Sequence, residues 1–230
     1  QDILFELDNG NLKLEKYNLH YWRLLHMGAQ PIPPVVARRI LAYLPQLDFD
    51  VSYGLTESGG PGCLNLGIKN LHKLGSVGRP APGWQAKIVD DNGREVPPET
   101  PGELLVKGPD MMRCYFKNEK ATKATLVDGW LHTGDIAKKD ADGFYYIIDR
   151  KKDVIISGGE NIFPADIEDF LRSHPAIKDV AVFGLPHCRL GEVVAALVEV
   201  KPGYSCAENE LHCFCEALPN PERKVFANDI

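Results

Sequence analysis

The pattern of apolar and polar residues along the chain first predicts a strand, a helix and a second strand. An apolar run over 21–27 ends at Gly28, and Pro33 and Pro34 then open a helix with one apolar face (Val36, Ala37, Ile40, Leu41 and Leu44). A second apolar run over 49–53 predicts the next strand. Because a right-handed crossover makes two such strands parallel, we expect both to end at the sheet edge where α/β proteins bind ligands.

The middle of the chain changes to short β patterns separated by turns. Residues 85–90 and 102–107 predict paired strands. Asp142-Gly143, between 136–140 and 144–149, is typical of a β-hairpin turn. We therefore expect a small antiparallel subdomain here.

Beyond Arg150 the strand and helix patterns are mixed again. The pattern predicts one helix opened by Pro164, a second capped by Ser205 with Glu208, and three strands (154–157, 179–184 and 192–200). A compact α+β lobe is expected.

These regions define the expected fold class, α/β plus α+β. Residues 1–74 would be the end of a large α/β domain, 75–151 a small antiparallel β subdomain, and 152–230 a small α+β C-terminal domain. The first residues contain neither an initiator methionine nor a signal-peptide pattern. This suggests that the chain begins inside a larger protein.

Composition narrows the class of protein. The chain has 230 residues, 44% hydrophobic and 25% charged, which is typical of a soluble globular protein. A net charge of −6 argues against a nucleic-acid partner. No apolar run approaches the roughly 20 residues that span a bilayer, so we expect no transmembrane segment and a cytoplasmic location. The 6 cysteines include no CxxC pair, which favours reduced thiols over disulfides.

The end of the second predicted strand carries the first candidate chemistry. In the segment YGLTES, Tyr53 provides a ring, Thr56 a hydroxyl and Glu57 a carboxylate. These groups suit a purine face, a phosphate oxygen and a Mg²⁺ ion, which prefers hard oxygen ligands. A turn through Gly54 with Glu57 as a solvated charge explains the same residues.

Three more polar motifs follow, each with two interpretations. Asp135, expected on a loop in the segment HTGD, could accept hydrogen bonds from both ribose hydroxyls or be an ordinary turn aspartate. The basic run at Arg150 could contact phosphate or lie at a wet boundary between lobes. Gly158 and Gly159 would let a ligand approach the backbone, or simply form a tight turn.

The joint order of these motifs resembles the adenylate-forming superfamily of acyl-CoA synthetases, luciferases and nonribosomal adenylation domains. The similarity runs over essentially the whole chain, through MGAQP, YGLTES, GSVGRPAPG, GELLVKGP, DGWLHTGD, DGFYYIIDRKKDVIISGGENIFPADIE and HPAIKDVAVFGLP. It implies that a carboxylate attacks the α-phosphate of MgATP to give an acyl-adenylate and pyrophosphate. A thiol then displaces AMP after the terminal domain has turned. On this resemblance residues 1–74 end the adenylate-binding domain.

The resemblance also implies roles for the matching residues. The nucleotide-binding set would be Gly28, Ala29, Gln30, Tyr53, Gly54, Thr56, Asp135 and Arg150. In this set Tyr53 would flank adenine and Asp135 would bind the ribose diol. Thr56, Glu57 and Arg150 would be the catalytic residues, with Glu57 as the Mg²⁺ ligand.

The last part of the resemblance concerns the second reaction. Lys152 would be the hinge of the terminal domain, and Gly158, Gly159 and Glu160 would line the path of coenzyme A. The segment SGGENIFPADIE resembles fatty-acyl and related CoA synthetases more than amino-acid-activating domains, so CoA is the favoured acceptor. The alternatives are an adenylation domain that loads a carrier protein, a non-catalytic AMP-binding fragment, and a luciferase-like oxygenase.

Two elements of the superfamily are missing from this sequence. The phosphate-binding loop would lie before Gln1, and the catalytic lysine would lie after Ile230. Since adenylation depends on charge stabilisation at the phosphates, we expect this chain alone not to form adenylate. Met27 and Gln30 depart from the residues that the superfamily often has there, and the acyl substrate and oligomeric state are not encoded in these motifs.

Overall fold

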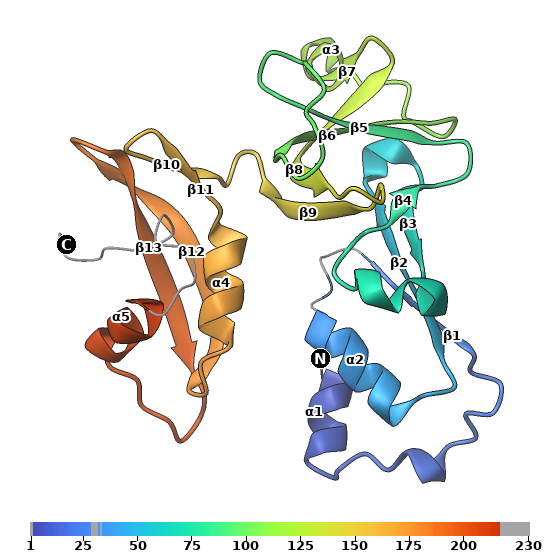
Figure 1. Cartoon of the computed structure of the whole chain (residues 1–230), viewed down its shortest axis with the longest axis vertical. Helices are drawn as coiled ribbons and strands as arrows, with labels where there is room; N and C mark the ends of the chain where they lie inside the picture. Colours follow the sequence, from blue (N-terminus) through green and yellow to red (C-terminus); the bar gives the residue numbers. More distant parts are fainter. Residues whose placement is uncertain (1, 29–31, 33, 217–230) are drawn as a thin grey trace. The chain divides into compact units, whose positions relative to one another are not determined.

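A computed structural model of the chain describes residues 2–28, 32 and 34–216 (Figure 1). The chain forms two compact units, Gln1–Ile147 and Ile148–Ile230. None of the helices in the described part of the chain is long and apolar enough to cross a membrane. The further division of the first unit near residue 75, and the domain boundary at 151/152, stay predictions.

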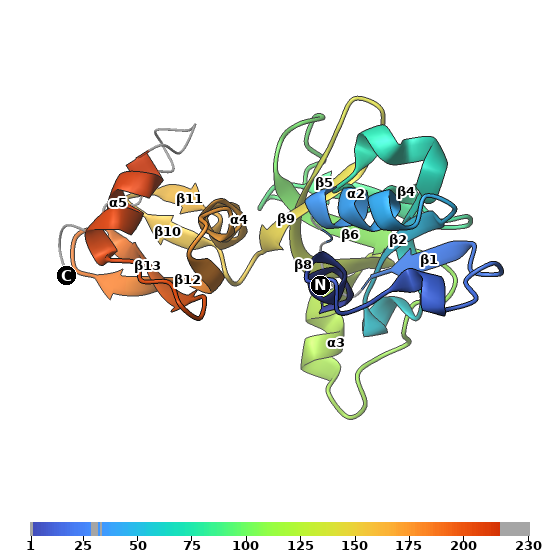
Figure 2. The same ribbon diagram turned by 90° about the horizontal axis from the view of Figure 1, so that it is seen from below.

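The first unit begins with the predicted strand, helix and strand. β1 (Leu24–Met27) and β2 (Asp48–Gly54) pair in parallel, as expected, and α2 (Pro34–Tyr43) connects them. β3 (Pro61–Leu66) and β4 (Arg79–Pro80) extend the sheet antiparallel, in the order β1-β2-β3-β4. Figure 2 shows α2 lying along this sheet, where buried Ala37 packs against Phe49 and Val51.

Shorter elements surround this sheet. They are α1 (Asp2–Asp8) and the 3-10 helices η1 (Leu14–Lys16), η2 (Thr56–Ser58) and η3 (Gly67–Lys73). Asp8 joins α1 to α2, because its carboxylate pairs with Arg39 and accepts a hydrogen bond from Tyr43 Oη at 2.8 Å. Only η2 is part of the candidate site.

The rest of the first unit is the antiparallel β region. Its strands are β5 (Gln85–Val89), β6 (Gly102–Lys107), β7 (Leu126–Val127), β8 (Trp130–Lys139) and β9 (Tyr145–Arg150), which runs into the second unit, and its helix is α3 (Glu119–Thr125). β5 and β6 pair as predicted, and β8 and β9 form the expected hairpin, with Asp140 N donating to Phe144 O at 2.9 Å.

The placement of Asp135 on a loop was wrong. β8 begins at Trp130, so the segment HTGD lies inside this strand. Alternate residues of the strand, Leu131, Thr133, Asp135 and Ala137, are buried. Burial of these alternate side chains therefore stabilises the strand, although the polar residues of the segment HTGD are typical of a loop.

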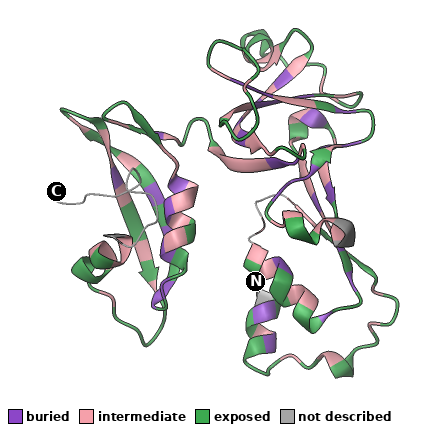
Figure 3. Ribbon diagram, in the orientation of Figure 1, coloured by how far each residue is buried: buried purple, intermediate pink, exposed green. Residues whose placement is uncertain are grey.

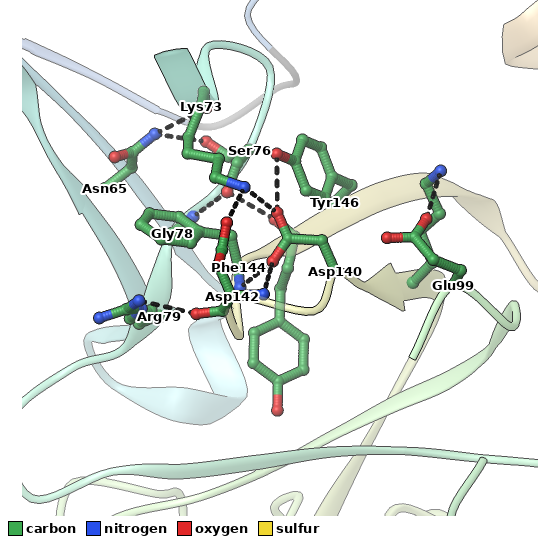
Figure 4. Close-up of polar contacts among 12 residues, drawn as sticks. Asn65, Lys73, Ser76, Gly78, Arg79, Glu99, Asp140, Asp142, Phe144 and Tyr146 are labelled. Carbon is green, nitrogen blue, oxygen red and sulfur yellow. Dashed lines mark hydrogen bonds and ion pairs between the residues drawn. The ribbon is translucent and has the colours of Figure 1, made fainter. Parts of the chain in front are cut away.

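A polar cluster ties the β8–β9 hairpin to the first sheet (Figure 4). Lys73 Nζ lies 2.7 Å from a carboxylate oxygen of Asp140 and 2.7 Å from one of Asp142. The guanidinium of Arg79 lies over the Phe144 ring, 4.5 Å from its centroid. Buried residues of both sheets share one core (Cys63, Val77, Ala81, Trp84, Ile88, Leu104, Val106, Leu131, Ala137 and Tyr145).

Within residues 148–216, the described part of the second unit, one sheet in the order β11-β10-β13-β12 is accompanied by two helices. Its elements are β10 (Ile155–Ser157), β11 (Glu160–Ile162), α4 (Pro164–Arg172), β12 (Ile177–His187), β13 (Gly191–Val200) and α5 (Glu208–Glu216). Figure 3 shows buried residues along α4, and Ile167 and Leu171 of this helix join the core with Val180, Val182 and Val194.

Two local details of the second unit differ from the sequence analysis. Gly158 and Gly159, with φ of 59° and 92°, form a two-residue hairpin turn into β11, a strand that the pattern did not indicate. The capping box at Ser205 was wrong, because α5 begins at Glu208 and the Ala207 carbonyl accepts its first backbone hydrogen bond. The opening of α4 by Pro164 is confirmed.

Candidate nucleotide and metal site

Two of the proposed nucleotide-binding residues are hydrogen-bonded to each other. Tyr53, near the end of β2, donates from Oη to Asp135 Oδ2 of β8 at 2.6 Å. Burial, followed by the negative charge of Asp135, raises the pKa of the Tyr53 phenol. The phenol therefore stays protonated and remains a donor, and the ring and the carboxylate are held side by side.

A bulge in β8 sets the position of Asp135. The register between β6 and β8 shifts between Glu103 and Leu105, and Gly134 has a φ of 71°. Thr133 Oγ1 donates to Leu104 O at 2.6 Å and accepts from Asp135 N at 3.1 Å. Such bulges re-aim side chains, and this one fixes Asp135 through its own backbone.

The turn after β2 carries Thr56 and Glu57. Ser58 is 1% exposed, and its Oγ accepts from Leu55 N at 2.9 Å and reaches Gly60 O at 2.6 Å. A Cβ on Gly54 would lie 2.4 Å from Gly60 O, so only glycine fits at this position. Ser58 thus shapes the turn from inside, and Thr56 is exposed next to Glu57.

Glu57 is held by a residue that the sequence analysis did not identify. Tyr115 Oη donates to Glu57 Oε1 at 2.7 Å, and Met112 N donates to the Glu57 carbonyl at 2.8 Å. A carboxylate has about four lone-pair sites, so acceptor capacity remains on Glu57 after this bond. With the Thr56 hydroxyl nearby in sequence, the donor atoms are oxygen, which fits a Mg²⁺ ion shared with phosphate.

A second missed feature lies beside Gly28. His26 Nδ1 is 2.5 Å from Asp50 Oδ1, and His26 Nε2 is 2.9 Å from Ser52 Oγ. An ionised carboxylate only accepts, so Nδ1 carries a proton towards Asp50 and Nε2 can accept from Ser52. A Cβ on Gly28 would lie 2.9 Å from Ser52 Oγ. The three hydrogen-bonded side chains of His26, Asp50 and Ser52 therefore form a polar group next to Gly28.

The remaining proposed residues lie in the second unit or outside the described residues. Ala29 and Gln30 belong to the latter group. Arg150 is exposed at the end of β9, and the Lys152 side chain is 73% exposed. Gly158, Gly159 and Glu160 form the exposed tip of the β10–β11 hairpin, where Gly158 N donates to Leu190 O at 2.8 Å.

Comparison with protein families identifies the family to which the chain belongs. The chain belongs to the AMP-binding enzyme family, whose family model matches residues 2–116. The model of the AMP-binding enzyme C-terminal domain matches residues 166–224.

Similar proteins include two kinds of CoA ligase. The chain is 41% identical to a long-chain-fatty-acid–CoA ligase of Escherichia coli O6:H1, over 93% of this chain and 38% of that protein. It is 43% identical to a 2-succinylbenzoate–CoA ligase of Bacillus cereus, over 90% of this chain and 46% of that protein. The chain therefore spans about two fifths of the length of such curated relatives.

Two solved structures of o-succinylbenzoate CoA synthetase from Bacillus subtilis share the fold. The complex with the acyl-adenylate intermediate has a TM-score of 0.82 and 33% identity, covering 97% of this chain and 44% of that one. The complex with ATP and magnesium ion has a TM-score of 0.81 and 32% identity, covering 98% of this chain and 49% of that one.

Proposed function

We propose that this chain is part of an AMP-forming acyl-CoA ligase, which activates a carboxylic acid with MgATP and transfers the acyl group to CoA. The observation that carries the proposal is the hydrogen bond between Tyr53 and Asp135, with Glu57 on the turn that follows Tyr53. Membership of the AMP-binding family and the similarity to CoA ligases support it.

In the proposed first reaction, the substrate carboxylate attacks the α-phosphorus of ATP and pyrophosphate leaves. Tyr53 and Gly28 would flank the adenine, while Asp135 would accept hydrogen bonds from the ribose hydroxyls. Thr56 would donate to an α-phosphate oxygen, and Glu57 would hold the Mg²⁺ ion. When bound, this ion supplies charge neutralisation at the phosphates.

In the proposed second reaction, the CoA thiol attacks the acyl carbonyl and AMP leaves. Arg150 would contact the ribose or phosphate, and Lys152 would be the hinge about which the C-terminal domain turns. Gly158 and Gly159 have positive φ, which supports the proposal that this hairpin tip lines the path of CoA. Glycine backbone carries no side chain and so leaves room for the narrow pantetheine arm.

The proposal is tested on the full-length protein with a panel of carboxylic acids. We expect pyrophosphate release that requires an acid, ATP and Mg²⁺, and CoA should then accelerate AMP release. Acceleration by a phosphopantetheinyl carrier protein instead of CoA would favour the carrier-loading alternative. Binding of AMP by calorimetry without any turnover would favour a non-catalytic AMP-binding role.

The 230-residue chain by itself provides a second test. We expect it to form no acyl-adenylate, so acid-dependent pyrophosphate release from the purified chain would contradict this part of the proposal. The proposed partners are a carboxylic acid, ATP and CoA, with no nucleic acid. We further propose a cytoplasmic location.

A further inference from the structure

We propose that Tyr115 is a positioning residue that fixes the Glu57 carboxylate for binding of the divalent cation. This inference rests on the proposed function. The observation is the 2.7 Å hydrogen bond from Tyr115 Oη to Glu57 Oε1, which joins residues 58 positions apart. Glu57 lies on η2, whereas Tyr115 lies between β6 and α3.

Tyr115 is itself anchored by the first turn of α3. Its backbone N donates to Thr122 Oγ1 at 2.9 Å, and Thr122 Oγ1 donates to Asn118 O at 2.9 Å. Asn118 is the N-cap of α3, and its side chain accepts from Ala121 N at 3.1 Å. The phenol is therefore presented from a hydrogen-bonded turn, which limits its freedom to move.

The segment before Tyr115 also contacts the turn that carries Glu57. Met112 N donates to Glu57 O at 2.8 Å, and a Cβ on Gly59 would lie 2.3 Å from Asp110 O. Both the backbone and the carboxylate of Glu57 are thus held by residues 110–115. A glutamate side chain that is ordered in advance loses less conformational entropy when it binds a metal ion.

The chemistry of the bond suits a positioning role. The Tyr115 phenol donates its only O–H proton to the Glu57 carboxylate at 2.7 Å. It occupies one acceptor site on Oε1 and leaves the others for the ion. Tyr115 would therefore orient the ligand without contacting the metal ion or the nucleotide.

The test uses Tyr115→Phe in the full-length protein, with Tyr146→Phe as the matched control. Tyr146 Oη also reaches a carboxylate, Asp140 Oδ2 at 3.3 Å, in a cluster without site residues. Mn²⁺ replaces Mg²⁺ as the probe, and its affinity in the presence of ATP is measured by electron paramagnetic resonance. We expect Tyr115→Phe to weaken Mn²⁺ binding about threefold to tenfold, which corresponds to the loss of one hydrogen bond of ordinary net strength. Tyr146→Phe should leave it unchanged.

Metal-free AMP affinity separates positioning from a general structural effect. We expect AMP binding by Tyr115→Phe to match that of the original protein, and its turnover to recover at high Mg²⁺. Equal losses of Mn²⁺ and AMP affinity, or an unchanged Mn²⁺ affinity, would overturn the inference. If Tyr115→Phe does not fold, Thr122→Val tests the same anchor, and a selective loss of Mn²⁺ affinity is again expected.

The inference and the proposed function can fail separately. If the original protein shows no acid-dependent pyrophosphate release but Tyr115→Phe still weakens Mn²⁺·ATP binding selectively, the ligase proposal fails and the positioning role stands. If the original protein is an active ligase and the Mg²⁺ requirement of Tyr115→Phe is unchanged, only the positioning role fails.

Discussion

Tyr53 and Asp135 are 82 positions apart in the chain, yet the Tyr53 phenol donates a 2.6 Å hydrogen bond to the Asp135 carboxylate. Tyr53 comes from the sheet that contains the parallel β1–β2 pair, and Asp135 from the antiparallel sheet. The bond therefore joins the two sheets of the first unit at the proposed nucleotide site. It also orients both residues before any ligand binds.

We expect Tyr53→Phe to lower the free energy of unfolding of the chain. It removes the donor to a buried carboxylate, which costs about 1–3 kcal/mol. Urea denaturation measures the change, and Tyr43→Phe is the control, because Tyr43 makes its 2.8 Å bond to the Asp8 carboxylate at an exposed position. The control should change stability by less than about 0.5 kcal/mol. Equal effects of the two variants would contradict a special role for the buried bond.

Stability should fall at alkaline pH. Burial raises the pKa of the Cys63 thiol to about 12 and also raises the pKa values of the Tyr53 and Tyr145 phenols. These groups hold their protons more tightly in the folded state. Their contribution to the free energy of unfolding is therefore fully present below the unfolded pKa values of about 8.5 and 10, and it is lost as the pH rises above them. Urea midpoints measured from pH 8 to pH 11 should decrease steadily. A double variant, Tyr53→Phe with Tyr145→Phe, should show a shallower decrease, and a flat profile for the original chain would rule out this linkage.

Gly78→Ala should prevent stable folding of the first unit. Gly78 has a φ of 89°, and a Cβ there would lie 1.8 Å from Leu64 O, which is backbone and cannot move aside. Gly93→Ala is the matched control, since Gly93 has a φ of 76° with no atom within 4 Å of its added Cβ. The control should lose only about 1 kcal/mol, the cost of the left-handed backbone. Thermal melts followed by circular dichroism distinguish the two, and similar melting temperatures would contradict the proposed clash.

Thr133→Val should weaken both the β8 bulge and AMP binding. The substitution keeps the shape but removes the donor to Leu104 O and the acceptor for Asp135 N, at a cost of about 1–3 kcal/mol. Thr100→Val, at an exposed position, is the control. AMP affinity of the full-length protein is measured by calorimetry alongside unfolding. If stability falls while AMP affinity is unchanged, the bulge does not position Asp135 for the ligand.

Much of the local structure could be predicted from the sequence. The apolar runs and the prolines indicated β1, α2, β2 and α4, and the Asp-Gly turn indicated the β8–β9 hairpin. These signals depend on residues that are close together in the sequence, so the sequence alone is enough to predict these elements. The prediction for Asp135 was wrong because a polar segment typical of a loop lies within a partly buried strand. The prediction for Ser205 was wrong because the helix begins later, at Glu208.

The contacts that build the candidate site are of a different kind. The sequence by itself determined the order of the elements, the motif residues and the turn that carries Glu57. Only the tertiary structure decided that Tyr115 donates a hydrogen bond to Glu57 and Tyr53 donates one to Asp135. The same holds for the hydrogen bonds that join His26 to Asp50 and Ser52. Each of these contacts depends on strand register or on the packing of distant segments, and a shift of one residue would turn the side chains away.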